Sequence, residues 1–295
     1  HTLRTLQALA QNDLAQESEL FIYADAPKKD STKQEKENNR AVSQVIKQQN
    51  WCAEVTIIEA KTNKGLAKSI SEGVTEVIKK YGKAIVLEDD IVPNNGFLKY
   101  MNQALELYKN DKKVFGISGG AFPTNKEVDM NTFFLPIMSS WGWATWERAW
   151  ENIVFDANFL IQQLEKKNIT VKEYNFGELP YYQMLRAQVE GKIDSWAVCS
   201  YATQVLNSAY FLFPKYSLIR NIGFDSSGIH SQNSDDLFFG SVNQTEYLEI
   251  EKIPINPNNE GAKAVEKAFK KQFGKKSFPK RVFDFLIRKI KRLLN

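Results

Sequence analysis

Two kinds of apolar pattern alternate through the first 120 residues of the chain. Short, continuous apolar runs typical of strands occur at residues 19–25, 55–58, 84–87 and 114–118. Between them, apolar residues recur at helical spacing in segments around residues 3–10, 42–46, 66–78 and 97–108. This alternation predicts an α/β fold, with a mostly parallel sheet that carries helices on both faces.

The pattern is different in two other parts of the chain. The very polar stretch from Lys28 to Arg40 is expected to begin as a mobile surface loop, ahead of a helix at residues 42–46. From about residue 121 the alternation stops and aromatic residues crowd together. Helices are predicted there over residues 156–167, 177–191 and 193–208, followed by an irregular segment over 232–262. We therefore expect one domain with halves at 1–120 and 121–262, and a tail at 263–295.

Three consecutive acids, Glu88, Asp89 and Asp90, follow the apolar run at 84–87. Open α/β sheets bind ligands at the carboxyl ends of their strands. Adjacent carboxylates repel one another, and a hard divalent cation that bridges to a phosphate relieves this repulsion. The alternative is a solvated acidic loop, because charge runs usually face water.

The composition, with 43% hydrophobic and 25% charged residues in a chain of 295, is ordinary for a globular protein. Cys52 and Cys199 are far apart and have no metal-like spacing, which suits a reducing compartment. No apolar run approaches the roughly 20 residues of a membrane span, and no signal peptide is recognisable. The chain enters a predicted helix directly from His1, so we expect a first strand of the natural domain to precede it.

The net charge of +4 is unevenly distributed. Residues 263–295 contain twelve Lys or Arg and two acids, so the rest of the chain has a net charge of −6. A basic overall charge is therefore no indication of a nucleic-acid-binding core. Residues 281–295 predict a basic amphipathic helix, which suits an anionic membrane surface, although packing on the domain would also explain it.

The order of several short motifs resembles that of a known enzyme class. The motifs are Asn63-Lys-Gly65, Val86-Leu-Glu-Asp-Asp-Ile91, Ser140-Trp-Gly-Trp-Ala-Thr-Trp146, Ile193-Asp-Ser-Trp196, Ser217-Leu-Ile-Arg-Asn-Ile-Gly-Phe-Asp225 and Gly228-Ile-His230. Over residues 1–231 the chain resembles nucleotide-sugar glycosyltransferases of the GT-A class. The resemblance implies a Rossmann-like fold with a mixed, mostly parallel sheet flanked by helices. Within that class it is most similar to bacterial sugar transferases with a Glu-Asp-Asp variant of the Asp-x-Asp motif, a variant shared by animal N-acetylglucosaminyltransferase I.

The resemblance implies roles for the acids and for a late histidine. Asp90 would ligate Mn²⁺ or Mg²⁺, and Glu88 and Asp89 would contact the ribose and sugar of the donor. His230 would add a metal or diphosphate contact, although a lone histidine is also often structural. The metal would act as a Lewis acid that neutralises charge on the departing nucleoside diphosphate.

An inverting transferase also needs a carboxylate that takes a proton from the acceptor hydroxyl. Relatives place acids around the tryptophan at 196, but the position that follows it here is Ala197. Asp194 is our first choice for this base and Glu178 our second. Either could instead be a capping or surface acid.

Four of the six tryptophans lie between residues 141 and 150. Although aromatic residues often simply pack, we expect Trp141, Gly142 and Trp143 to line the donor-sugar or acceptor pocket, and Trp146 and Trp150 to belong to the core.

Asn63, Lys64 and Gly65 are expected to close on the nucleotide; the alternative is a plain turn that needs glycine at position 65. The GxGxxG and GxxxxGK[ST] patterns are absent, which disfavours dehydrogenases and P-loop proteins.

These expectations describe a metal-dependent hexosyl- or N-acetylhexosaminyltransferase that uses a nucleotide-sugar donor, with a UDP-sugar foremost. Its acceptor would be a cell-surface glycan or a polyprenyl-linked glycan, and inversion is the expected stereochemistry. We expect it in the cytoplasm, attached to the inner face of the cell membrane. The alternatives are a sugar-phosphate nucleotidyltransferase and a catalytically inactive nucleotide- or glycan-binding module.

Overall fold

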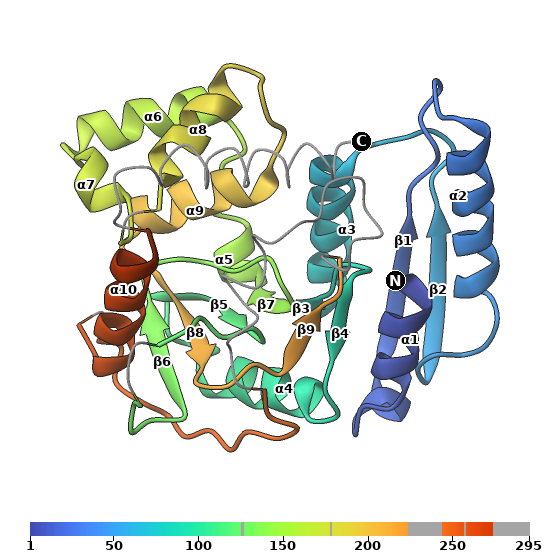
Figure 1. The fold of residues 1–295 in the computed structure, drawn as a ribbon, viewed down its shortest axis with the longest axis horizontal. Coiled ribbons are helices and arrows are strands. Elements are labelled where there is room, and N and C mark those ends of the chain that lie inside the picture. Colours follow the sequence, from blue (N-terminus) through green and yellow to red (C-terminus); the bar gives the residue numbers. More distant parts are fainter. Residues whose placement is uncertain (125–126, 178, 224–243, 257, 274–295) are drawn as a thin grey trace.

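A computed structural model describes residues 1–124, 127–177, 179–223, 244–256 and 258–273 of the chain (Figure 1). Its strands are β1 (Glu19–Ala24), β2 (Glu54–Glu59), β3 (Lys83–Val86), β4 (Ile91–Pro93), β5 (Val114–Ser118), β6 (Thr132–Leu135), β7 (Trp143–Trp146), β8 (Tyr210–Pro214) and β9 (Ile219–Asn221). Its helices are α1 (Thr2–Ala10), the 3₁₀ turn η1 (Ala15–Glu17), α2 (Lys33–Ile46), α3 (Leu66–Tyr81), α4 (Phe97–Leu107), α5 (Glu147–Trp150), α6 (Ala157–Lys166), α7 (Val171–Tyr174), α8 (Tyr181–Val189), α9 (Trp196–Leu206) and α10 (Glu260–Phe273).

The strands of the described residues form three groups. β1 pairs with β2, β4 pairs with β9, and the central sheet has the order β3-β7-β5-β8-β6. The expected α/β class is confirmed, and the central sheet is mixed, as expected. β5 and β8 are parallel, whereas β7 lies antiparallel between β3 and β5, and β6 is antiparallel to β8. All antiparallel pairs of this sheet involve β6 or β7, which enter it without the strand–helix alternation of the first half.

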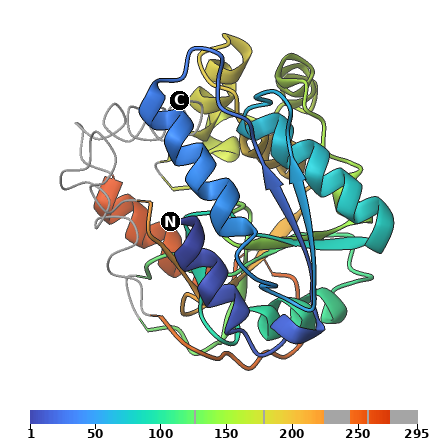
Figure 2. The same cartoon turned by 90° about the vertical axis from the view of Figure 1, so that its right-hand side faces the viewer.

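The β1–β2 pair separates two layers of helices. Alternate side chains of β1 face opposite sides. Leu20 and Ile22 pack with residues of α1 and α2, whereas the Tyr23 ring lies 3.1 Å from where a Cβ on Gly73 of α3 would stand. Figure 2 shows α1 and α2 on one side of these strands and α3 on the other.

The central sheet also has two apolar faces. Phe134 of β6 and Leu212 of β8 pack with α4, while Phe133 and Phe213, their neighbours in sequence, pack in the cluster that includes residues of α6, α8, α9 and α10. Strands from both halves of the sequence therefore interleave in one sheet that is covered on both sides, which makes the two halves parts of one folded unit (Figure 1).

Helix α2 begins earlier than expected. A capping box starts it, because the Thr32 hydroxyl accepts from the Glu35 backbone N–H and the Glu35 carboxylate accepts from the Thr32 N–H. Lys33 to Arg40 are therefore helical, and the irregular part of the polar stretch is limited to residues 28–32. Ile46 is the one fully buried residue of α2, so the apolar spacing that reveals a helix is weak in its first turns.

The later helices agree with the sequence pattern, since α6, α8 and α9 lie inside the predicted segments. The expected tail boundary at residue 263 falls inside α10, which packs Val265 and Phe269 against the body. The amphipathic segment 281–295 lies outside the described residues. Among the helices that the structure describes, none has the length and apolar character needed to cross a bilayer.

Candidate functional site

The acidic triplet lies on a tight turn between β3 and β4. The Ile91 N–H donates to the Glu88 carbonyl (3.1 Å) and closes the turn. Glu88 is 9% exposed, Asp90 is half-buried, and Asp89 faces solvent. The alternative of a fully solvated acidic loop therefore fits Asp89 alone.

Asp89 is held against the first turn of α1. Its carboxylate accepts a hydrogen bond from the Thr2 hydroxyl (3.1 Å), and its carbonyl accepts from the Thr5 hydroxyl (2.8 Å). The first turn of α1 has no acid of its own. Asp89 therefore supplies the negative charge that a helix N-terminus favours. The expected contact of Asp89 with a nucleotide-sugar stays a prediction.

Asp90 faces strand β9. The Ile222 N–H donates to the Asp90 carbonyl (2.8 Å), which extends the antiparallel pairing of β4 and β9. A Cβ on Gly223 would stand 2.2 Å from Asp90 Oδ2, so the carboxylate occupies the space that any other residue at 223 would need. Glycine at this position therefore lets Asp90 hold its present orientation.

The segment Trp141–Trp143 reaches the same edge of the central sheet. Trp143, the first residue of β7, pairs with Val86 of β3 and Ser118 of β5. Gly142 adopts φ +54°, and its carbonyl accepts from the Gly119 N–H at 2.7 Å. The register therefore sets the tryptophan segment beside the end of β3, two residues before Glu88.

Trp143 is buried more deeply than expected for a side chain that lines a pocket. It is 2% exposed, and its ring contacts those of Trp196 (centroids 4.8 Å apart) and Trp150 (5.7 Å), which also contact each other (6.2 Å). We call these three side chains the indole stack. The Trp143 ring is thus buried among other indoles, and its own indole N–H has no hydrogen-bond acceptor among the described residues. Trp141 is 8% exposed.

Trp146 and Trp150 belong to the core, as predicted. Both are buried, and each satisfies its indole N–H. Trp146 donates to the Leu105 carbonyl (3.0 Å) and Trp150 to the Thr75 hydroxyl (2.8 Å).

Asp194 is exposed in the loop before α9, two residues ahead of Trp196. The next residue is fixed by a hydrogen bond from the Ser195 N–H to Gln188 Oε1 (2.8 Å). Because Trp196 stacks on Trp143, the indole stack connects the start of α9 to the strand beside the acidic turn. The other expected base, Glu178, and the expected metal contact, His230, lie outside the described residues.

Neither cysteine is placed as a nucleophile. Burial first, and the charge of Asp194 second, raise the pKa of Cys199 to about 12, and burial raises the pKa of Cys52 to about 11. Both thiols therefore stay protonated at neutral pH.

Asn63, Lys64 and Gly65 form the turn that starts α3. Gly65 adopts φ +77°, which agrees with the alternative of a turn that needs glycine. The backbone of this turn binds the Asp25 carboxylate at the end of β1. Asn63 and Lys64 are exposed, so their side chains remain accessible.

The oxygen ligands near the turn suit a hard cation that retains water and binds substrate phosphates. Among the described residues, no group of three or more His, Cys, Asp or Glu side chains is arranged to hold a metal by itself. Mg²⁺ is commonly bound by one or two carboxylates together with phosphates of the substrate. Asp90 and Glu88 provide one or two carboxylates of this kind. They leave the remaining positions around a cation to substrate phosphates and water.

Sequence reasoning did not single out Gly223, Asn221, Asp25 or Thr2. Asn221 uses its side-chain oxygen to accept from the Gly223 N–H (2.8 Å), and its buried Nδ2 has no acceptor among the described residues. Asn221 and Gly223 lie in one of the motifs quoted above, but their roles depend on the pairing of β4 with β9, which the local pattern does not reveal.

The comparisons with known proteins add no identification: no protein-family model and no curated protein matches this chain.

Proposed function

We propose that the protein is a metal-dependent glycosyltransferase that moves a sugar from a nucleotide-diphosphate donor, with a UDP-sugar foremost, to a glycan or lipid-linked acceptor. The observation that carries the proposal is the convergence at the acidic turn. Three strands meet there. Trp143 of β7 pairs through its backbone with Val86, two residues before Glu88. Asn221 of β9 pairs with Ile91, next to Asp90, and its buried Nδ2 has no acceptor among the described residues. A phosphate or sugar oxygen is an acceptor that this amide would bind.

Asp90, oriented by the space at Gly223, would hold Mn²⁺ or Mg²⁺ with the donor diphosphate, and Glu88 and Asp89 would bind the ribose and sugar. The bound metal supplies charge neutralisation for the departing diphosphate. Asp194 would take the proton from the acceptor hydroxyl, which favours a single displacement with inversion. The protonated thiols offer no covalent alternative.

Thermal unfolding with nucleotides tests the proposal. UDP with Mn²⁺ should raise the Tm, because a ligand at about 100 times its Kd stabilises the folded state by about 2.7 kcal/mol. The change Asp90→Asn should abolish this shift and the metal-dependent release of UDP from UDP-sugars. The matched control is Asp13→Asn, since Asp13 lies beyond the other end of α1 and accepts from the Tyr247 hydroxyl.

Each outcome distinguishes between the hypotheses. Full activity of Asp90→Asn would refute the metal assignment. Pyrophosphate release in place of UDP release would indicate a nucleotidyltransferase, and UDP binding without turnover across sugars and acceptors would indicate an inactive binding module.

We also propose cytoplasmic attachment to the inner face of the membrane, supported by the basic amphipathic pattern of residues 281–295. Co-sedimentation with anionic vesicles should decrease when residues 281–295 are removed, and it should weaken as the salt concentration rises. Equal binding by the shortened chain would contradict this part of the proposal.

A further inference from the structure

The Asp25 carboxylate accepts several hydrogen bonds from the turn that precedes α3. Its Oδ1 accepts from the Lys64 N–H (2.8 Å) and its Oδ2 from the Gly65 N–H (2.8 Å). The Asn63 side-chain amide also donates to Oδ2 (3.1 Å) and to the Ala26 carbonyl (2.7 Å). One carboxylate therefore binds three consecutive residues that lie about forty positions further along the chain.

Asp25 itself is anchored by the fold. The pairing of β1 with β2 continues past the strands through the hydrogen bond from the Ala60 N–H to the Ala24 carbonyl (2.9 Å). The Asn39 side chain on α2 donates to the Asp25 carbonyl (3.0 Å), and the Ala26 N–H donates to Asp25 Oδ1 (2.9 Å). These hydrogen bonds fix the backbone on both sides of Asp25 independently of the contacts that its carboxylate makes with the turn.

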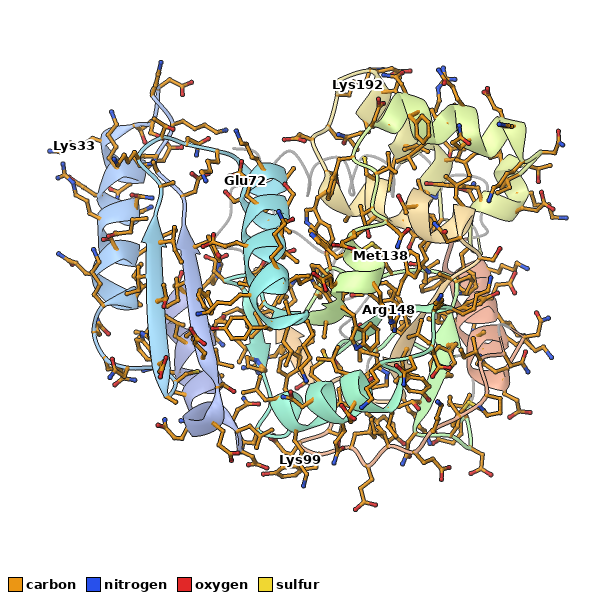
Figure 3. The ribbon with its side chains drawn as sticks, turned by 180° about the vertical axis from the view of Figure 1, so that it is seen from behind. Lys33, Glu72, Lys99, Met138, Arg148 and Lys192 are labelled. Carbon is orange, nitrogen blue, oxygen red and sulfur yellow. The ribbon has the colours of Figure 1, made fainter. Side chains whose placement is uncertain are left out.

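The Lys64 side chain is held much less firmly than the Lys64 backbone. Its ammonium pairs with Glu72 on α3 (2.7 Å; Glu72 is labelled in Figure 3), and both side chains are more than two-fifths exposed. Ion pairs between exposed side chains contribute little to stability and are screened by salt. Hydrogen bonds to a charged carboxylate are stronger, and here they fix the backbone. The ammonium can therefore leave Glu72 for another anion while the turn keeps its shape.

We infer that Asp25 is a positioning residue: it contacts no substrate, but it holds the 63–65 turn in one backbone conformation from which the Lys64 ammonium can be transferred from Glu72 to a phosphate of the donor. This inference rests on the proposed function for the identity of the anion. The hold of Asp25 on the turn is a separate claim that can be tested without any ligand.

The sharpest variant is Asp25→Asn, which keeps the shape of the side chain. If the NH₂ group replaces Oδ2, the Gly65 N–H loses its acceptor. If it replaces Oδ1, the Ala26 N–H loses its acceptor and the Lys64 N–H keeps only its longer bond to the other oxygen (3.1 Å). We expect amide hydrogen exchange at Lys64 and Gly65 in the ligand-free protein to accelerate more than tenfold. Since small displacements of binding groups cost up to about 100-fold, the KM for the donor should rise by about 10- to 100-fold, with a smaller change in kcat.

The matched control is Glu72→Gln, which removes the charge partner of Lys64 and leaves the Asp25 bonds intact. It should leave amide exchange at the turn unchanged and keep the donor KM within about twofold, because the exposed pair is weak. Asp25→Glu should restore part of the slow exchange, since it returns the charge with one additional methylene.

The outcomes separate the two claims. Unchanged exchange in Asp25→Asn would overturn the positioning role. Faster exchange with an unchanged donor KM would show that the turn does not serve the donor, and would also overturn the inference. If the wild-type protein neither binds UDP with Mn²⁺ nor turns over UDP-sugars, the proposed function fails together with the donor half of the inference, while the exchange experiment still decides whether Asp25 holds the turn.

Discussion

At the scale of single residues, the candidate site depends on one glycine and on one hydrogen bond between distant parts of the chain. Gly223 leaves space for the Asp90 carboxylate, and Thr2 fixes Asp89. The acids themselves stood out in the sequence because three carboxylates follow an apolar run. Gly223 and Thr2 did not, because their importance comes from contacts between residues more than eighty positions apart.

Gly223 provides a prediction at this scale. Gly223→Ala should displace the Asp90 carboxylate, since the new Cβ would stand 2.2 Å from Oδ2. Donor turnover should fall by about 100-fold, as expected when a binding group moves by about 1 Å. Mn²⁺-dependent UDP binding measured by calorimetry should weaken in parallel.

The control for this substitution is Gly120→Ala at the same edge of the sheet. There a Cβ would stand 3.4 Å from the nearest atom of Ile219, an ordinary contact, so we expect binding close to that of the wild type. Equal effects of the two alanines would argue against a specific role for the space at Gly223.

At the scale of elements, helix α10 belongs to the folded body. Phe269 is fully buried and packs edge-to-face against Phe122 (centroids 5.2 Å apart) and Phe176 (6.0 Å). In the sequence, the basic residues of this segment made it look continuous with the tail. The buried face of α10 depends on its contact with β6, which the sequence pattern does not reveal.

Phe269→Ala should therefore lower the free energy of unfolding by about 3–5 kcal/mol, the usual cost of truncating a buried phenylalanine. Urea unfolding measures this loss. Lys270→Ala, on the exposed side of the same helix, should change stability by less than about 0.5 kcal/mol. A small effect at position 269 would mean that α10 is not part of the cooperative unit.

The sequence was informative about elements where the apolar pattern is local and strong. The strand at 114–118 was located to the residue, because all five of its residues are buried. The start of α2 was missed because one capping box, and no broad apolar face, defines it. The aromatic strands β6, β7 and β8 could not be ordered from sequence, because their pairing depends on neighbours from distant parts of the chain.

At the scale of the whole molecule, exposed carboxylates link stability to pH. Hydrogen bonds from the Thr32 backbone, the Lys47 ammonium and the Thr170 backbone are the largest causes that lower the pKa values of Glu35, Glu59 and Glu173, respectively, from the usual 4.5.

Acid should therefore destabilise the protein through these groups. A carboxyl whose pKa is lower in the folded state binds fewer protons there than in the unfolded state, so unfolding takes up protons. The contribution is complete above pH 4.5 and is lost as the pH falls through the lowered folded values. Urea unfolding at a series of pH values should show stability decreasing below about pH 4.5, whereas a rise in that range would contradict the assignment.

The order of the central sheet has a consequence for biosynthesis. β3 has its hydrogen-bonded neighbour in β7, some sixty residues later, and β5 needs β8, almost a hundred residues later. A ribosome adds about 5–20 residues per second, so β3 leaves the exit tunnel seconds before β7 is made. The nascent chain must therefore carry the acidic turn with an unpaired strand edge, a state prone to aggregation. Arrested chains that end before β7 should accordingly depend on chaperones, and those that extend past β8 should be released from them.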